Sequence, residues 1–193
     1  FVSEKDSIGT SIEGRTIWSF KVSDNPDIDE DEPEVLYTGL THAREPLSMM
    51  NLFFFVRWLC ENYSSDPTAE YLVDHREMWF VPIINPDGYG YNETIAPTGG
   101  GMHRKNRRPN PDNSNCNSGT DQGVDLNRNY GYHWGPNYSG SSGNPCSGIY
   151  RGTSAFSEPE TEAISDFILA RQFKNVLHYH TYSNVLIHSW GDG

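Results

Sequence analysis

The chain has 193 residues, enough for one domain with a hydrophobic core. Its 26 acidic and 14 basic residues give a net charge of −12, which argues against nucleic acid or an anionic membrane as a partner. No apolar run is long enough to span a bilayer. The chain begins at Phe1 without a signal peptide, so we expect a removed leader or a piece of a longer protein.

The first third of the chain predicts two strands and a helix. Residues 16–22 alternate apolar and polar side chains, which is typical of a strand. Residues 34–40 are apolar enough for a central strand. Pro46 suits a first helical turn, so residues 47–61 predict a helix. We expect its buried face to comprise Met50, Phe53, Phe54 and Trp58.

The next elements are a short helix, a strand and a turn. Residues 68–74 predict the helix and residues 77–84 predict the strand. The tetrapeptide at residues 85–88 (NPDG) predicts a turn by composition. Residues 91–155 predict a long loop rich in Gly, Asn and Ser. Because such loops in compact domains are usually functional or disordered, and this one is rich in aromatic residues, we expect function.

The last part predicts one helix and two short strands. Ser157 and Glu160 form a capping box, so a helix should run from residue 157 to about 171. Residues 175–179 and 185–188 predict strands. Strands that alternate with helices predict an α/β fold with its site at the strand ends.

The three cysteines predict one disulfide and one free thiol. Cys116 and Cys146 lie in polar loops, and a bond between them would add roughly 3–4 kcal/mol of stability. Two unpaired loop thiols are the alternative. A disulfide would indicate an oxidising compartment. Cys60 lies in the apolar helical run, where we expect a buried free thiol.

His42 and Glu45, three residues apart at a helix start, form the most suggestive pair for a metal. His180 follows 135 residues later, just past a predicted strand. Catalytic zinc takes three protein ligands and keeps one open position, with no fourth ligand evident here. The alternative is a loop histidine and a carboxylate favoured by the helix dipole.

A second group of polar residues suits the binding of a carboxylate. Arg128 can make a two-pronged bond to a carboxylate, and Asn127 can add a donor. Arg104 and Lys105 follow a glycine run. A solvated basic surface is the alternative, but it explains the Asp-x-Asn-Arg-Asn cluster from Asp125 less well.

Several segments, in order along the chain, resemble the zinc carboxypeptidases of the pancreatic carboxypeptidase A type, and most closely the bacterial carboxypeptidase T branch. The resemblance covers nearly the whole chain. The segments are Ile8-Gly9, Glu13-Gly14-Arg15, residues 33–38 (PEVLYT), His42-Ala43-Arg44-Glu45, Asn85-Pro86-Asp87-Gly88, Arg104-Lys105-Asn106-Arg107, Asp125-Leu126-Asn127-Arg128-Asn129 and His180-Thr181-Tyr182-Ser183.

The resemblance implies a mixed, largely parallel twisted sheet with helices on both faces, and a role for each matched residue. It implies that Arg104 stabilises the oxyanion and that Asp125 accepts a hydrogen bond from His42. The zinc ligands would be His42, Glu45 and His180. The substrate-binding residues would be Asn127 and Arg128 for the terminal carboxylate, with Arg44 and Tyr182 in neighbouring subsites. His103 departs from the family, which often has Trp there.

The family also needs a glutamate as general base and a mobile tyrosine, both well downstream of the third zinc ligand. We therefore expect residues 1–193 to be a single partial catalytic domain, clipped at both ends. Two expectations follow. One edge of the sheet should be open or paired with something else, and the isolated chain should bind zinc but hydrolyse peptides poorly.

The acidic run of residues 27–34 has two readings. Such a run is usually a solvated loop, but oxygen-rich loops also bind calcium, as the carboxypeptidase T branch does. The candidate calcium ligands are Asp29, Glu30 and Glu34.

The sequence thus predicts a zinc carboxypeptidase, secreted or periplasmic, acting on peptides with a free C-terminus and monomeric when complete. A zinc amide hydrolase acting on cell-wall peptides and an inactive zinc-binding module are the alternatives. The retention of Arg128 favours the carboxypeptidase.

Overall fold

Five strands form one mixed sheet in the computed structural model of the chain, which describes residues 1–111, 116, 119–137 and 139–188. The order is β1-β2-β4-β3-β5. Strands β3, β4 and β5 are parallel, and β2 is antiparallel to both β1 and β4. The bounds are β1 Asp6–Thr10, β2 Thr16–Val22, β3 Glu34–Thr38, β4 Glu77–Val81 and β5 Asn175–His178. The α/β prediction is confirmed.

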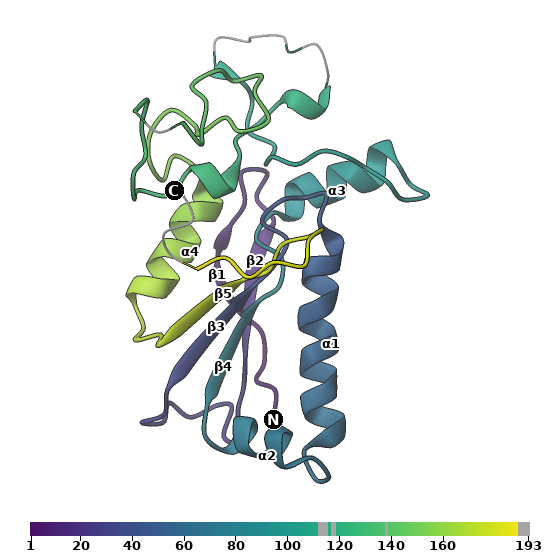
Figure 1. The fold of residues 1–193 in the computed structure, drawn as a ribbon, viewed down its shortest axis with the longest axis vertical. Helices are drawn as coiled ribbons and strands as arrows, with labels where there is room; N and C mark the ends of the chain where they lie inside the picture. The colour runs from purple at the N-terminus through teal and green to yellow at the C-terminus, as the bar shows by residue number, and fades with distance from the viewer. Residues whose placement is uncertain (112–115, 117–118, 138, 189–193) are drawn as a thin grey trace.

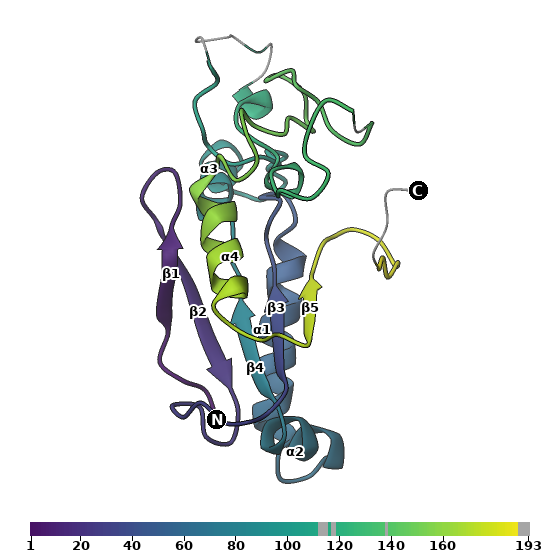
Figure 2. The same cartoon turned by 90° about the vertical axis from the view of Figure 1, so that its left-hand side faces the viewer.

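Helices cover both faces of this sheet, as Figures 1 and 2 show from two sides. Helices α1 (Pro46–Asn62) and α2 (Pro67–Asp74) pack on one face through a core that includes Leu52, Leu59 and Phe80. Helix α4 (Pro159–Leu169) packs on the other face with Leu36 and Ile164. Successive residues of a strand point to opposite faces, which is why β3 contributes to both cores.

The loop-rich segment between α3 (Pro86–Ile95) and α4 gathers above the carboxyl ends of β3 and β4 (Figure 1). Its described residues include the short 3-10 helices η2 (Gly119–Asp121) and η3 (Leu126–Arg128). Leu126 is fully buried in the α4-side core and anchors η3 there. The polar residues on either side of Leu126 are thereby held at the strand ends, where open α/β sheets bind ligands.

The predicted buried face of α1 was wrong by about one residue. Met50 is 52% exposed, Phe53 41% and Phe54 71%, and Trp58 is half-buried. The buried residues are Ser48, Met49, Leu52 and Leu59. Each residue turns the helix by about 100°, and apolar residues lie all round α1, so the sequence period alone did not fix the face. For the same reason Cys60, next to Leu59, is free but exposed rather than buried.

Residues 85–88 start a helix instead of forming an isolated turn. Asn85 is the N-cap of α3, and its Oδ1 accepts a hydrogen bond from Gly88 N at 3.0 Å. Pro86 takes the first helical position, which its fixed φ suits. A turn and a first helical turn have similar residue preferences, which explains the error. Strand β4 ends at Val81, before Pro82.

Helix α4 begins two residues later than predicted and ends at Leu169. Its N-cap is Glu158, without a side-chain cap, so the capping box of Ser157 and Glu160 was wrong. Ser157 Oγ instead donates to the Glu158 carboxylate at 2.8 Å, and Glu160 accepts the amide of Ile12 at 2.9 Å. Tertiary partners replace the local cap.

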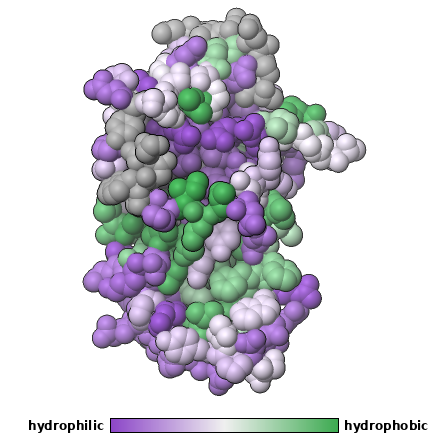
Figure 3. All heavy atoms as spheres, viewed as in Figure 1, coloured by the Kyte–Doolittle hydropathy of each residue, from purple (hydrophilic) through white to green (hydrophobic). Residues whose placement is uncertain are grey.

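Residues 185–188 form no strand, contrary to the prediction. Val185, Leu186 and Ile187 are 68%, 88% and 74% exposed, and a strand needs a hydrogen-bonded partner. Among the described residues β5 pairs only with β3, so its outer edge is open as expected. Figure 3 shows apolar side chains gathered on the face that β5 and the following segment occupy in Figure 1.

Strand β1 was not predicted, because its sequence DSIGT lacks an apolar alternation. It is added to the sheet by pairing with β2. No helix in the described part of the chain has the length and apolar character needed to cross a membrane.

The corrected face of α1 predicts unequal effects of two truncations on the same helix. In the chain of residues 1–193, Leu59→Ala should cost about 2–5 kcal/mol of unfolding free energy, because Leu59 is fully buried. Phe54→Ala is the control and should cost less than about 1 kcal/mol, because Phe54 is exposed. Urea unfolding measures both, and equal losses would contradict the assigned face.

Candidate metal centre and active site

Three predicted zinc ligands converge at the carboxyl ends of β3 and β5. His42 and Glu45 lie in the loop after β3, where Glu45 is the N-cap of α1. His180 lies two residues past the end of β5. His42 Nδ1 is 2.8 Å from Glu45 Oε1, and His180 Nδ1 is 2.9 Å from Glu45 Oε2. The parallel pairing of β3 and β5 brings residues 138 positions apart into contact.

The donor set of this cluster fits a zinc ion. One atom from each of His42, Glu45 and His180 lies within 4.8 Å of the others. The two Nδ1 atoms face each other at 3.2 Å. Each imidazole can direct the lone pair of its Nδ1 atom into the space between the two rings. A cation in that space would bind both nitrogens and the Glu45 carboxylate. Two imidazoles and a carboxylate form a known set of catalytic zinc ligands. His42 and Glu45 are buried, whereas His180 is exposed and leaves an accessible side.

Glu45 is held in its charged form by its neighbours. Burial alone would raise the pKa of this carboxyl, but hydrogen bonds from His180 and His42 outweigh burial and hold its pKa far below the usual range. The amide of Thr181 also donates to Oε2 at 3.2 Å. A charged carboxylate is the form that binds a metal cation.

Asp125 lies behind the cluster and is fully buried. Its Oδ1 is 3.2 Å from His42 Nε2, an ion-pair distance. Within the described residues His42 Nε2 has no hydrogen-bond partner of good geometry, so its contact with Asp125 is a close approach. Burial would raise the pKa of Asp125, but His42, Arg104 and Arg128 lower it overall.

Arg104 contacts the same carboxylate from the other side. Its Nη2 and Nε donate to Asp125 Oδ2 at 2.9 and 3.2 Å. Its Nη1 lies 3.8 Å from Glu45 Oε1. The structure therefore brings the predicted oxyanion-binding residue beside the metal ligands, with one guanidinium nitrogen facing them.

Asp125 also starts η3, which carries Asn127 and Arg128. Asp125 Oδ1 accepts the amide of Asn127 at 3.1 Å. The Asn127 side chain is exposed, and Arg128 is half-buried. Arg128 Nε donates to Gly140 O at 2.7 Å and Nη1 donates to Asn127 O at 2.9 Å. These bonds fix the guanidinium on the loop while Nη2 stays available for a ligand in the described structure.

The remaining predicted substrate residues lie at the surface. Tyr182 is 97% exposed. Arg44 is exposed and borders a depression of 470 Å³ beside Arg104. The other residues that line this depression are Met102, Lys105, Asp121, Gly148 and Ile149.

The disulfide between Cys116 and Cys146 is present, as predicted, with Cα atoms 5.3 Å apart and an S–S distance of 2.07 Å. It closes the loop that carries η2 and η3. Lys105, adjacent to Arg104, is buried beneath this loop. Nothing in the sequence around Lys105 indicates that this lysine is buried.

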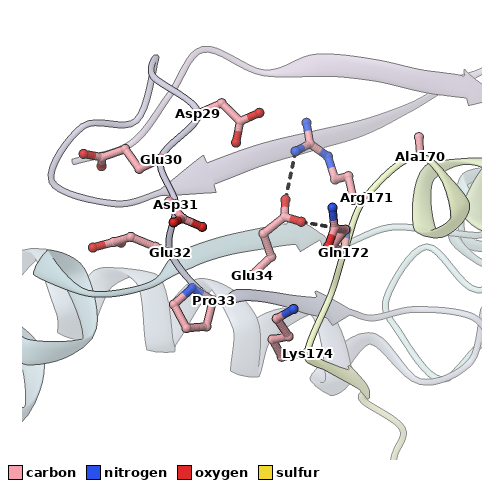
Figure 4. Close-up of a pocket in the computed structure, with 10 residues that line it drawn as sticks. All are labelled: Asp29, Glu30, Asp31, Glu32, Pro33, Glu34, Ala170, Arg171, Gln172 and Lys174. Atoms are coloured by element: carbon pink, nitrogen blue, oxygen red, sulfur yellow. Dashed lines mark hydrogen bonds and ion pairs between the residues drawn. The ribbon is translucent and has the colours of Figure 1, made fainter.

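The acidic loop is arranged differently from the proposed calcium set. Asp29, Glu30 and Glu34 line a hollow of 330 Å³ (Figure 4). Figure 4 shows Glu34 turned toward Arg171, whose Nη1 donates to it at 2.9 Å. The amide of Gln172 donates to the same carboxylate at 2.9 Å. The carboxylates that lie within 4.8 Å of one another belong to Asp24, Glu30 and Glu32.

Comparison with known proteins gives a consistent result. The family model for zinc carboxypeptidases matches residues 1–193. A zinc carboxypeptidase of Saccharothrix mutabilis subsp. capreolus is 44% identical over 129 residues, which cover 67% of this chain and 27% of that protein. One of Simulium vittatum is 36% identical over 185 residues, covering 95% of this chain and 55% of that protein.

Solved structures agree. The crystal structure of carboxypeptidase A from Helicoverpa armigera matches with a TM-score of 0.77 and 31% identity, covering 94% of this chain and 41% of that one. The chain thus spans 27–55% of the length of these three proteins.

The cluster predicts one zinc ion per chain. His180→Gln should weaken zinc binding by at least about 100-fold, because losing a ligand costs more than the 10–100-fold typical of its supporting residues. His75→Gln is the control, since His75 is exposed and lies at the end of α2, in neither candidate metal group. Calorimetric titration with zinc measures both. Unchanged zinc affinity in His180→Gln would refute the assignment.

Proposed function

Because the chain belongs to the zinc carboxypeptidase family, we propose that the protein containing it is a zinc-dependent metallocarboxypeptidase that removes C-terminal residues from peptides and proteins. The observation that carries the proposal is the convergence of His42, Glu45 and His180 in one cluster, backed by Asp125 and Arg104. A metal ion and a cation beside it suit the hydrolysis of an amide.

The roles of the residues around the metal follow from their contacts. His42, Glu45 and His180 would hold zinc, which when bound polarises a carbonyl and lowers the pKa of its water to about 7. Asp125 orients the His42 ring from behind and holds the Arg104 guanidinium. Arg104 is then preorganised to stabilise the negative charge that develops on the scissile carbonyl oxygen.

Recognition of a chain end is assigned to η3. Arg128 and Asn127 would bind the terminal carboxylate of the substrate, through the Arg128 nitrogen not used by the loop and the exposed Asn127 amide. Arg44 and the exposed Tyr182 would contact neighbouring parts of the peptide. A site with these anchors removes residues from the end of a chain and leaves internal bonds intact.

One catalytic role is left unfilled by the described residues of the site. Glu45 serves as a ligand, and Asp125 is occupied by His42, Arg104 and the Asn127 amide. The resemblance assigns the general base to a glutamate downstream of this chain. Residues 1–193 therefore form a partial catalytic domain in this proposal, and the isolated chain should bind zinc but hydrolyse peptides poorly.

We also propose that the protein is secreted or exported to the periplasm, because a disulfide is stable in an oxidising compartment. We further propose that the complete enzyme is a monomer with no nucleic-acid or membrane partner. No observation favours the zinc amide hydrolase acting on cell-wall peptides or the inactive zinc-binding module.

Calcium binding by Asp29, Glu30 and Glu34 stays a prediction, although Glu34 pairs with Arg171. We propose a second ligand set in the same loop, Asp24, Glu30 and Glu32, whose carboxylates lie within 4.8 Å of one another. Calcium at millimolar concentration should raise the melting temperature of the zinc-loaded protein, because a ligand that binds only the folded state stabilises it. The Glu30→Gln variant should lose this rise. A melting temperature indifferent to calcium would count against the site.

The function is tested with the full-length protein and a pair of peptides that differ only in their C-terminus. A free carboxylate should be cleaved, and the amidated peptide should not. Removal of zinc with a chelator should abolish cleavage, and added zinc should restore it. Cleavage of both peptides at equal rates would contradict an exopeptidase.

The carboxylate anchor is tested in the same assay. Arg128→Gln should raise the KM for the free-carboxylate peptide about 10–100-fold, because a charge-assisted hydrogen bond contributes roughly 1.5–3 kcal/mol. Arg57→Gln is the matched control, since Arg57 pairs with Glu61 on the exposed side of α1. An unchanged KM in Arg128→Gln would remove Arg128 from the substrate site.

A further inference from the structure

Lys105 is a buried lysine with an unusual set of partners. It is 1% exposed. Its Nζ donates to Pro145 O at 2.9 Å and to Ser147 O at 3.0 Å. No carboxylate in the described ranges forms an ion pair with this ammonium. The Tyr150 ring centroid lies 5.9 Å from Nζ, so an aromatic face and two main-chain carbonyls surround the charge.

This arrangement is energetically costly. Burial lowers the pKa of Lys105 to about 8, and attraction to Asp121 and Asp125 offsets only part of the effect. Burying an ammonium is unfavourable unless its hydrogen-bonding groups are satisfied. A methionine or leucine would fill the same space without the cost of burying a charge. We therefore attribute the lysine at this position to its hydrogen bonds with the two carbonyls.

The two carbonyls belong to one arm of the disulfide loop. Pro145 and Ser147 flank Cys146, and we call residues 145–149 the Cys146 arm. The disulfide ties this arm to Cys116, within the same loop. Lys105 ties the arm to the segment that carries Arg104. The arm thus has two independent tethers, one a disulfide and the other two hydrogen bonds from the Lys105 ammonium.

The backbone at Arg104 and Lys105 is held by hydrogen bonds to the loop that carries His42. Arg104 O accepts the amide of Ala43 at 3.0 Å. Lys105 O accepts a hydrogen bond from Asn85 Nδ2 at 3.0 Å, and the same amide lies 3.3 Å from Thr41 O. Lys105 therefore connects the Cys146 arm, through hydrogen bonds, to the backbone on both sides of His42.

The Cys146 arm forms part of the depression beside Arg104. Gly148 and Ile149 of the arm line it together with Arg44 and Arg104. Arg128 and Asn127 do not line it. If these two bind the terminal carboxylate, the depression is left for the peptide residues that precede the scissile bond.

We propose that Lys105 is a positioning residue that holds the Cys146 arm against the Arg104 segment, and so sets the wall contacted by substrate residues upstream of the scissile bond. The inference rests on the proposed function. It assigns Lys105 an effect on the binding of longer peptides, whereas the bond-breaking step depends on the residues around the metal.

The test compares the full-length, zinc-loaded protein with its Lys105→Met variant on two blocked peptides with free C-termini. One peptide has a single residue before the scissile bond and the other has four. Lys105→Met should raise KM about tenfold for the long peptide, with KM for the short peptide and both kcat values within twofold of wild type. Lys105→Arg, which keeps the donors, should restore part of the long-peptide KM.

Lys21→Met is the matched control. Lys21 is also buried, at 3% exposure, but it pairs with Glu77 in the sheet and borders no part of the depression. It should lower the melting temperature without changing the ratio of the two KM values. If Lys105 had only a structural role, Lys105→Met would also lower the melting temperature without changing the ratio of the two KM values. That result would overturn the inference.

The disulfide gives a second test, which can be made even if the Lys105→Met variant does not fold. Replacing both Cys116 and Cys146 with Ser frees the same arm and should raise KM for the long peptide selectively. A variant that loses only thermal stability would contradict the inference. If wild type cleaves neither peptide, the proposed function and the inference both fail. If wild type cleaves both and the variants keep its KM ratio, only the inference fails.

Discussion

The buried carboxylate of Asp125 holds the parts of the site together, because it contacts His42, Arg104 and η3. One of its oxygens lies 3.2 Å from His42 Nε2 and accepts a hydrogen bond from the amide of Asn127 in η3. The other oxygen accepts two hydrogen bonds from Arg104. A carboxylate that is fully buried is tolerated because each oxygen is paired. One charge therefore sets the orientation of His42, a proposed metal ligand, the position of Arg104, the proposed oxyanion-binding cation, and the start of the segment that carries Arg128.

The sheet positions these groups. Parallel pairing of β3 with β5 places His42 and His180 at one edge, and burial of Leu126 holds η3 above it. The outlines of this sheet were predictable, because residues 16–22 and 34–38 carry the strand pattern in their own sequence. The buried face of α1 was not, because Met49 and Met50 are equally apolar and only packing against the sheet chooses between them. The conformation of residues 185–188 was not predictable either. These residues are mostly apolar but have no strand to pair with among the described residues.

The site was more predictable than the fold details. The spacing of His42 and Glu45 alone is weak evidence for a metal, and His180 could be added to them because strand ends meet and because the chain resembles the zinc carboxypeptidases. The disulfide followed from two cysteines in polar loops. Lys105 could not be found in this way, because a lysine in a loop gives no sign that two carbonyls 40 and 42 residues away will bury it. The partner of Glu34 could not be found either, since Arg171 is 137 residues distant in the sequence.

We expect His42, Glu45 and His180 to bind one zinc ion and to leave one coordination position open. X-ray absorption at the zinc edge of the loaded protein tests it most directly. The spectrum should show two nitrogen ligands, together with carboxylate and water oxygens, at about 2.0–2.2 Å and no sulfur. In His180→Gln one nitrogen should be lost. A sulfur shell at about 2.3 Å, or a spectrum unchanged by that substitution, would contradict the account.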